Sequence, residues 1–286
     1  MINKLYQEIL AQILDEKNSN KYQTLKYADQ YTGMVAHPNE GYISFTVNPS
    51  ESFPLITLRD VGLKLFIAEM IWYLSGTIDP VWIRKYTKIW DDFADEDGLV
   101  RSSYGYRWRN HFGRDQILSA ISLLKRDPSS RQAVIMTWDP SCDGLDTERQ
   151  KNVPCVPMMQ FLILNNKLIL DVVWRSNDMY LGFPHDLAGF SLLQAIVAQK
   201  MSLEVGKLHY SILHSHLYDN QIESAKILLE TASDQPKVEL FLPENSFDIA
   251  RDGTDEQRDE LYTQIFDNLN SQYKPVQKLK KIKIVV

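Results

Sequence analysis

The stretch RSNDMYLGFPHDLAGF, residues 175–190, decides the fold and the chemistry expected of this chain. It places two carboxylates, Asp178 and Asp186, in mostly apolar surroundings, and an apolar run resumes at Leu187 directly after Asp186. A carboxylate that faces a dry pocket is costly unless it is paired, hydrogen-bonded or protonated. Asp186 therefore needs a partner, which other parts of the chain must supply.

The composition is that of an ordinary globular protein, with 286 residues, 44% hydrophobic and 24% charged. We expect a single domain over residues 1–286. The net charge of −6 argues against broad nucleic-acid binding. No apolar run has the length of a membrane span or of a signal-peptide core, so no membrane partner is expected. With only Cys142 and Cys155, the sequence favours a cytoplasmic protein without a disulfide framework.

Apolar periodicity predicts a mixture of helices and strands without regular βαβ alternation, and therefore an α+β fold. Asp60 is expected to cap one helix and Gly76 to end it, while Asn165-Asn166 predicts a hairpin turn. Helices are predicted over 2–17, 60–75, 79–90, 114–126, 187–202 and 219–231, and strands over 41–48, 132–138, 158–164, 167–176 and 207–218.

Cys155 is the first candidate for chemistry. It follows Pro154 at the end of a polar loop and directly precedes a strand, where a scaffold presents side chains to a cleft. A lone cysteine is more often a small buried hydrophobe. The nucleophile interpretation requires a nearby cation to raise the thiolate fraction, and Arg131 and Arg175 are the candidates.

Other polar residues in apolar segments leave two interpretations open. Glu69 in FIAEMIWYL is either a salt-bridged or partly exposed carboxylate, or a buried proton relay with a raised pKa. Trp90 and Tyr104, taken singly, are more often core residues than ligand contacts. His216 and Tyr218 alternate on one face of a strand, where hydroxyl binding and simple packing are equally open.

Several motifs stand in the order and spacing of one known family, over roughly residues 40–225. They are EMIWYLSG, IWDDFADEDG, YGYRWR, DPSSRQAVI, PC followed by QF, RSNDMYLGFP, AIVAQKMSLEVGKLHY and HSHLY. On these motifs the chain resembles the thymidylate synthase family, although residues 1–40 and 232–275 match poorly. The resemblance implies one α+β domain with a large twisted mixed sheet packed by helices, and an obligate homodimer formed through a sheet face.

The resemblance also implies roles for particular residues. Cys155 would add to C6 of a pyrimidine nucleotide, Glu69 would relay protons and Tyr104 would assist removal of the C5 proton. The substrate would be held by Arg175, Ser176 and a partner-supplied Arg131 at the phosphate, by His216 and Tyr218 at the sugar, and by Gln160 and Asp186. The co-substrate 5,10-methylenetetrahydrofolate would contact Ile89, Trp90, Asp178 and Gly182, and no metal is expected.

One departure from the family suggests the base that is recognised. Thymidylate synthases carry asparagine where this chain has Asp186, and an amide can donate to O4 of uracil and accept from N3–H. A protonated carboxyl matches the reversed edge of cytosine, and an ionised carboxylate matches cytosine protonated at N3. Val156 also replaces the histidine usual after the catalytic cysteine. We therefore predict that Asp186 selects cytosine, the alternative being an acid in a surface loop.

Further departures leave the phosphate and sugar contacts open. Gln132 stands in place of the second phosphate-binding arginine, and Gln30 lies where another arginine would be expected. His214, His185 and Phe93 replace an aspartate, a phenylalanine and a tryptophan. The two histidines are either packed or solvated side chains, or residues that alter water access and ribose recognition.

The one-carbon unit on C5 has two chemical fates. Hydride transfer from the folate gives a 5-methyl base and dihydrofolate, whereas water attack gives a 5-hydroxymethyl base and tetrahydrofolate. Cytosine-acting relatives with an aspartate selector include hydroxymethylases, and His185 favours a wetter site. We predict a cytidylate (CMP or dCMP) 5-hydroxymethyltransferase. The alternatives are a dCMP 5-methyltransferase, a thymidylate synthase acting on dUMP and, disfavoured by Cys155 and Glu69, a folate- or RNA-binding protein without activity.

Overall fold

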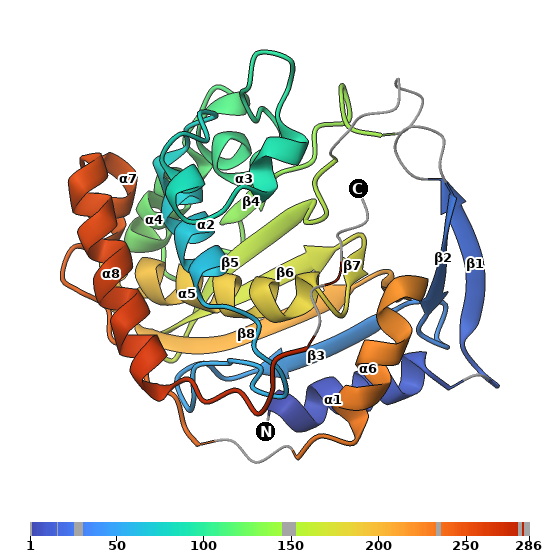
Figure 1. Cartoon of the computed structure of the whole chain (residues 1–286). Helices are drawn as coiled ribbons and strands as arrows, with labels where there is room; N and C mark the ends of the chain where they lie inside the picture. The colour runs from blue at the N-terminus through green and yellow to red at the C-terminus, as the bar shows by residue number, and fades with distance from the viewer. Residues whose placement is uncertain are drawn as a thin grey trace.

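The computed structural model describes residues 2–15, 17–25, 31–144, 153–232, 236–279 and 282 (Figure 1). Its helices are α1 (Ile2–Ile13), α2 (Lys64–Ser75), α3 (Tyr104–Tyr106), α4 (Gln116–Arg126), α5 (Gly182–Met201), α6 (Ile222–Leu229), α7 (Ser246–Asp252) and α8 (Asp255–Gln272). Short helical turns are η2 (Ile83–Lys85), η3 (Ile89–Phe93), η4 (Arg107–His111) and η5 (Asp219–Gln221). None of the helices in the described ranges is long and apolar enough to cross a membrane.

The larger sheet has the strand order β3-β8-β6-β5-β4, formed by β3 (Ile43–Val47), β8 (Glu204–Ile212), β6 (Lys167–Trp174), β5 (Met158–Leu164) and β4 (Val134–Met136). β6 and β8 are parallel and the other pairs are antiparallel, so the sheet is mixed. The long helix α5 packs against β6 and β8, and α2 packs on α5. Because α5 is enclosed in this way, buried residues occur all round its circumference.

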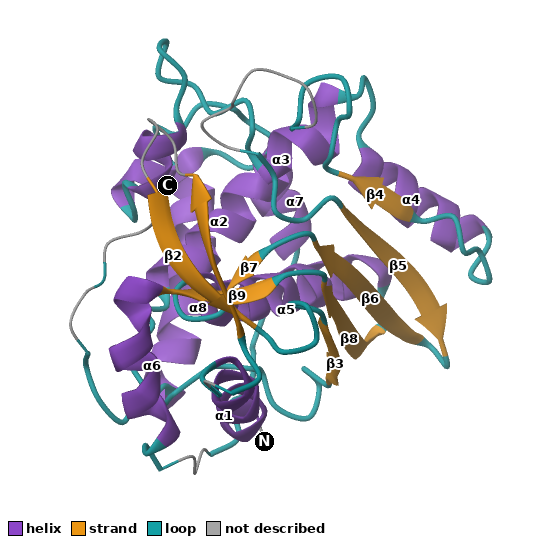
Figure 2. Cartoon of the chain, turned by 90° about the vertical axis from the view of Figure 1, so that its right-hand side faces the viewer, coloured by secondary structure: helices purple, strands orange, loops and turns teal. Residues whose placement is uncertain are grey.

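The opposite face of this sheet is less covered. Figure 2 shows the helices gathered on one side of the five strands. On the other side, the cross-strand pairs Met158–Val173 and Gln160–Asp171 are partly exposed, and Val134 and Met136 of the edge strand are 38% and 40% exposed. This is the face through which the family resemblance predicts dimer formation.

The smaller sheet has the order β1-β2-β9-β7, formed by β1 (Asn20–Leu25), β2 (Tyr31–Ala36), β9 (Ser215–Tyr218) and β7 (Asn177–Asp178). The chain passes from the larger to the smaller sheet twice, from β6 into β7 and from β8 into β9. The two crossings stay in register, because the Leu213 N–H donates to the Trp174 carbonyl and the Asn177 N–H donates to the His214 carbonyl. This double crossing places residues 175–178 beside residues 213–218.

The structure confirms the α+β class and several sequence predictions. Asn165 and Asn166 both have positive φ, 51° and 60°, as a two-residue hairpin turn requires. Gly76 ends α2 in the left-handed conformation with φ 71°. The helices predicted over 2–17, 114–126 and 219–231 are present with shorter bounds.

Other predictions of elements were wrong for local reasons. Asp60 does not cap α2, because its carboxylate accepts from the Gly62 N–H in a turn that precedes the helix. The helix predicted over 79–90 is two short turns, η2 and η3, interrupted where Thr87 Oγ1 accepts from the Ile89 N–H. The strand predicted over 207–218 is broken between the two sheets, and the helix predicted from 187 begins five residues earlier, at Gly182.

Candidate active site

Cys155 precedes β5 and is held beside the end of β6, because backbone and side-chain bonds join it to Arg175. The Arg175 N–H donates to the Cys155 carbonyl at 2.9 Å. The guanidinium donates to the carbonyls of Pro154 and Val153, at 2.8 Å each, and its Nη2 lies 3.8 Å from Cys155 Sγ. Arg175 therefore fixes the backbone that carries the thiol and also places a positive charge against the sulfur. Among the described residues Arg131 does neither, since it is exposed in the segment before β4.

The environment of the Cys155 thiol keeps it protonated in the unliganded protein. Burial raises the pKa of Cys155, the charge of Arg175 lowers it, and the charges of Asp186 and Asp178 raise it. The Cys155 N–H donates to Tyr104 Oη at 3.0 Å. Burial, together with Cys155 and Asp186, holds the pKa of Tyr104 well above its usual value, so Tyr104 acts as a neutral hydroxyl.

Glu69 projects from α2 and has an indole rather than a cation as its partner. Trp90 Nε1 donates to Glu69 Oε1 at 2.9 Å. Burial and the charge of Asp186 raise the pKa of Glu69 to about 8, with the Trp90 bond acting in the opposite direction. The ring of Tyr73 lies between the two aromatic residues of the site, 5.9 Å from Trp90 and 5.4 Å from Tyr104. Glu69 is thus a carboxylic acid at neutral pH, which is the state a proton relay needs.

Asp186 is the fifth residue of α5, and its partner is an amide. Asn177 Nδ2 donates to Asp186 Oδ2 at 2.9 Å, and Tyr210 Oη donates to the Asp186 carbonyl at 3.0 Å. Burial raises the pKa of Asp186 to about 7, the Asn177 bond lowers it, and the charge of Asp178 raises it. Asp186 is therefore close to half protonated at neutral pH. Asn177 is thus the partner that a carboxylate in this apolar stretch requires.

Asp178 is oriented by three donors. Its Oδ1 accepts from the backbone N–H groups of Tyr180 and Leu181, and its Oδ2 accepts from Gln221 Nε2 at 2.6 Å. Burial nevertheless raises the pKa of this carboxyl. Gly182 lies between the two aspartates, because a Cβ placed on it would be 3.1 Å from Asp186 Oδ2 and 3.7 Å from Asp178 Cβ. We refer to Cys155, Arg175, Tyr104, Glu69, Asp186 and Asp178 together as the thiol site.

The sugar-binding candidates on β9 face the thiol site. The rings of His216 and Tyr218 are 4.8 Å apart, and His214 Nδ1 lies 3.3 Å from His216 Nδ1. Burial and His214 lower the pKa of His216 to about 4, so its imidazole is neutral. Burial raises the pKa of Tyr218 to about 12, and the charges of Asp178 and Cys155 add to that rise.

Arg59 and His185 form a neighbouring polar pair. Arg59 is 7% exposed, and its guanidinium lies 4.4 Å from the centre of the Tyr180 ring. Burial and the charge of Arg59 lower the pKa of His185 to about 3, so this imidazole is also neutral. Within the described part of the chain, His185 Nδ1 and Arg59 Nε have no hydrogen-bond partner. The sequence analysis identified His185 but missed Arg59.

Among the described residues, no contact draws four of the predicted site residues into the thiol site. Gln160 Nε2 donates to the Arg131 carbonyl at 2.7 Å, so these two residues are held together at the edge of the larger sheet. Ser176 follows Arg175 at the crossing to β7, and Ile89 begins η3 beside Trp90. Their predicted roles remain predictions. Gln30 lies outside the described residues, and Gln132 is exposed next to Arg131.

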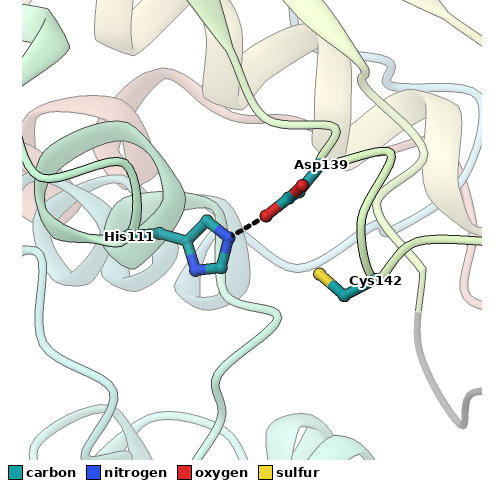
Figure 3. A group of neighbouring side chains, drawn as sticks. All are labelled: His111, Asp139 and Cys142. Atoms are coloured by element: carbon teal, nitrogen blue, oxygen red, sulfur yellow. Dashed lines mark hydrogen bonds and ion pairs between the residues drawn. The ribbon is translucent and has the colours of Figure 1, made fainter.

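A second polar cluster lies at the start of the loop that leads to Cys155. Figure 3 shows His111 Nε2 directed at Asp139 Oδ2, 2.6 Å away, with Cys142 nearby. The three ligand-type atoms lie within 4.8 Å of one another. However, Arg107 Nη1 is 3.1 Å from His111 Nε2 and 3.6 Å from Cys142 Sγ. A metal ion there would meet the guanidinium charge, so the cluster is better suited to fixing the loop than to holding a cation.

A thiol beside a guanidinium, with two carboxyl groups that hold protons near neutral pH, is the arrangement that enzymes with a nucleophilic thiol use. The chain belongs to the thymidylate synthase family, whose family model matches residues 4–266. It is 34% identical over 210 residues to thymidylate synthase from Corynebacterium aurimucosum, which covers 70% of this chain and 76% of that protein. The family match extends beyond the 40–225 segment that carries the sequence motifs. Members of this family transfer a one-carbon unit from methylenetetrahydrofolate to a pyrimidine nucleotide.

Proposed function

We propose that this protein is a cytidylate 5-hydroxymethyltransferase that acts on CMP or dCMP. The observation that carries the proposal is Asp186, a carboxyl group with a pKa of about 7 that belongs to the thiol site. Neutral Asp186 offers one donor and one acceptor side by side, which is the complement of N3 and the 4-amino group of cytosine. Uracil would place its N3–H against the acid O–H and its O4 against an acceptor oxygen. A mismatched edge of this kind leaves buried polar groups unpaired and is strongly rejected.

The chemistry assigned to the other residues follows from their protonation states. Arg175 stabilises the thiolate of Cys155 as its sulfur adds to C6, and Asp186 shares a proton with N3, which gains electron density in that step. C5 then becomes the nucleophile, for which methylenetetrahydrofolate supplies the one-carbon unit. Glu69 holds a proton near neutral pH and moves it within the site. Tyr104 keeps its proton. It therefore assists loss of the C5 proton by orienting the group that accepts this proton, and it does not act as a phenolate base.

The hydroxymethyl product is proposed because polar atoms lie beside the expected folate contacts. His185 has a neutral imidazole with Nδ1 unbonded within the described residues, and Arg59 is buried next to it. These groups favour an ordered water near C5. Loss of the C5 proton and cleavage of the bond to the folate nitrogen release tetrahydrofolate and leave an exocyclic methylene; water then adds to the methylene carbon as the Cys155–C6 bond breaks, which gives the 5-hydroxymethyl base. A deoxycytidylate 5-methyltransferase is the alternative if the same region stays dry.

Thymidylate synthesis from dUMP is the second candidate. It is favoured by the relative from Corynebacterium aurimucosum, which is described as a thymidylate synthase. The carboxyl group of Asp186 favours cytidylate instead. An amide offers uracil a donor for O4 and an acceptor for N3–H, and a carboxyl group offers the same order only when its proton is on the oxygen that faces O4.

We also propose a cytoplasmic homodimer. The partly exposed face of the larger sheet would be covered by a second copy, and Arg131 of each copy would reach the phosphate bound by the other. Arg131 is exposed and its backbone is fixed by Gln160, which suits a residue presented to a partner. Oligomeric state measured by light scattering, with Val134→Asp as the interface variant, tests this arrangement.

The experiment that tests the function is identification of products by mass. The protein is incubated with methylenetetrahydrofolate and, in parallel, with CMP, dCMP, UMP and dUMP. Hydroxymethylated cytidylate together with tetrahydrofolate is the expected result and also identifies the sugar. A methylated cytidylate with dihydrofolate would retain the base assignment but contradict water attack. Turnover of uridylates alone would contradict the role of Asp186.

A further inference from the structure

Asn177 is a buried amide that the sequence analysis did not single out. It is 3% exposed and lies on β7, the two-residue strand that follows the crossing between the sheets. Its backbone N–H donates to the His214 carbonyl at 2.9 Å, so the main chain fixes its position. Its side chain reaches across to the N-terminal part of α5 and donates to Asp186.

The hydrogen bond from Asn177 distinguishes the two oxygens of Asp186. Nδ2 of an amide only donates, so the oxygen that receives it, Oδ2, must act as an acceptor. Oδ2 is also enclosed by the backbone of Gly182, where a Cβ would lie only 3.1 Å from it. A carbonyl oxygen accepts more strongly than an acid hydroxyl, so the bond from Asn177 favours the neutral form of Asp186 that carries its proton on Oδ1. Oδ2 remains the carbonyl oxygen, and it has a second lone pair for the 4-amino group of a cytosine.

We propose that Asn177 is a specificity-determining positioning residue, which fixes the proton of Asp186 on Oδ1 and so sets the order of donor and acceptor presented to the base. The proposal rests on the proposed function. A carboxyl group without this anchor can exchange its O–H and C=O by rotation about Cβ–Cγ or by moving the proton. The exchanged form offers a donor to O4 and an acceptor to N3–H, which is the uracil edge. Asn177 thus discriminates against uridylate through its bond to Asp186.

The test compares Asn177→Leu with Asn177→Ser and with a matched control, Tyr210→Phe. Leucine is close in size to asparagine but cannot donate, and serine is small enough to be accommodated if leucine prevents folding. Tyr210→Phe removes a hydrogen bond to the backbone carbonyl of Asp186 and leaves its carboxyl group unchanged. The measured quantity is the ratio of kcat/KM for cytidylate to kcat/KM for uridylate, together with its pH profile.

We expect both Asn177 variants to lower the ratio by about tenfold or more, the effect of one hydrogen bond in a buried site. The Tyr210→Phe ratio should stay within about twofold of wild type. Because the side-chain amide of Asn177 stabilises ionised Asp186, its loss should also move the alkaline limb of cytidylate activity to higher pH, which a purely structural role would not do.

Two results would overturn the proposal. One is a wild-type ratio in whichever Asn177 variants fold, and the other is a ratio that falls equally in Tyr210→Phe. These results differ from failure of the proposed function, which would show as a wild-type protein that prefers uridylate before any substitution is made.

Discussion

Binding of cytidylate is predicted to weaken as the pH rises above neutrality. The complex contains one proton shared between Asp186 and N3 of cytosine, whichever of the two atoms carries it. The pKa of Asp186 in the unliganded protein is about 7, so below this pH the proton is already present. Above it, binding must take up a proton from solvent, and the proton therefore favours the bound state.

The size of this effect follows from linkage. Uptake of one proton costs a factor of ten in affinity per pH unit, or about 1.4 kcal/mol. Between about pH 7 and about pH 9 the affinity for CMP or dCMP would fall by at most about a hundredfold. Glu69 ionises in the same range, with a pKa of about 8, and its negative charge would hold the Asp186 proton more tightly. We therefore expect a loss of about tenfold to a hundredfold.

The assay is equilibrium titration calorimetry with CMP and dCMP in the absence of folate. Repeating it in buffers with different ionisation enthalpies counts the protons taken up. UMP serves as the control nucleotide, since its phosphate is the same and its base needs no added proton. Asp186→Asn serves as the control protein and should lose the pH dependence. An affinity for cytidylate that stays flat over this range, or an equal slope in Asp186→Asn, would refute the reasoning.

Three further substitutions test the thiol site. Cys155→Ser should abolish both turnover and exchange of the C5 hydrogen of cytidylate, measured with C5-tritiated substrate; near-normal exchange would contradict the covalent mechanism. Glu69→Gln should slow turnover, yet raise the free energy of unfolding. The unfolded wild-type carboxyl ionises above about pH 4.5, whereas the folded one keeps its proton up to a pKa of about 8, so the wild-type protein loses stability as the pH rises through this range and the glutamine variant does not. Urea unfolding should show a gain that grows over this range to at most about 5 kcal/mol, and a pH-independent difference would argue against burial of the charge. Arg175→Ala should weaken nucleotide binding and also slow thiol alkylation at neutral pH, since the guanidinium lies 3.8 Å from Sγ; unchanged nucleotide affinity would remove its phosphate role.

Features determined within a few residues were predictable from the sequence. The left-handed Gly76 and the Asn165-Asn166 turn depend on local backbone preferences that those residue types reveal. The prediction at Asp60 failed within the same range, because a turn at Gly62 competes for the same carboxylate as a helix cap. Periodicity could also not show that residues 207–218 divide between two sheets, since both parts alternate in the same way.

The partners in the site were much less predictable. Glu69 and Asp186 were identified as acids in apolar segments, but Asn177 and Gln221, which orient Asp186 and Asp178, are common polar residues in unremarkable positions. Their importance arises from contacts across 9 and 43 residues of sequence. Arg59 was missed for a related reason, because its site-facing position depends on packing against Tyr180, far along the chain.

Because of the double crossing between the sheets, the smaller sheet positions residues for both the nucleotide and the folate. Arg175 lies on one crossing and His216 follows the other. Asn177 and Asp178 form the strand β7, which pairs with Ser215 and His216 of β9. Arg175 is assigned to the nucleophile and the phosphate, His216 to the sugar and Asp178 to the folate. Asn177 acts on the base through Asp186, and all four residues move together if the strands stay paired. β2 is the outer neighbour of β9, with Ala36 opposite His216. A packing change in β2, remote from any reacting atom, would consequently change the affinities for the nucleotide and for the folate together.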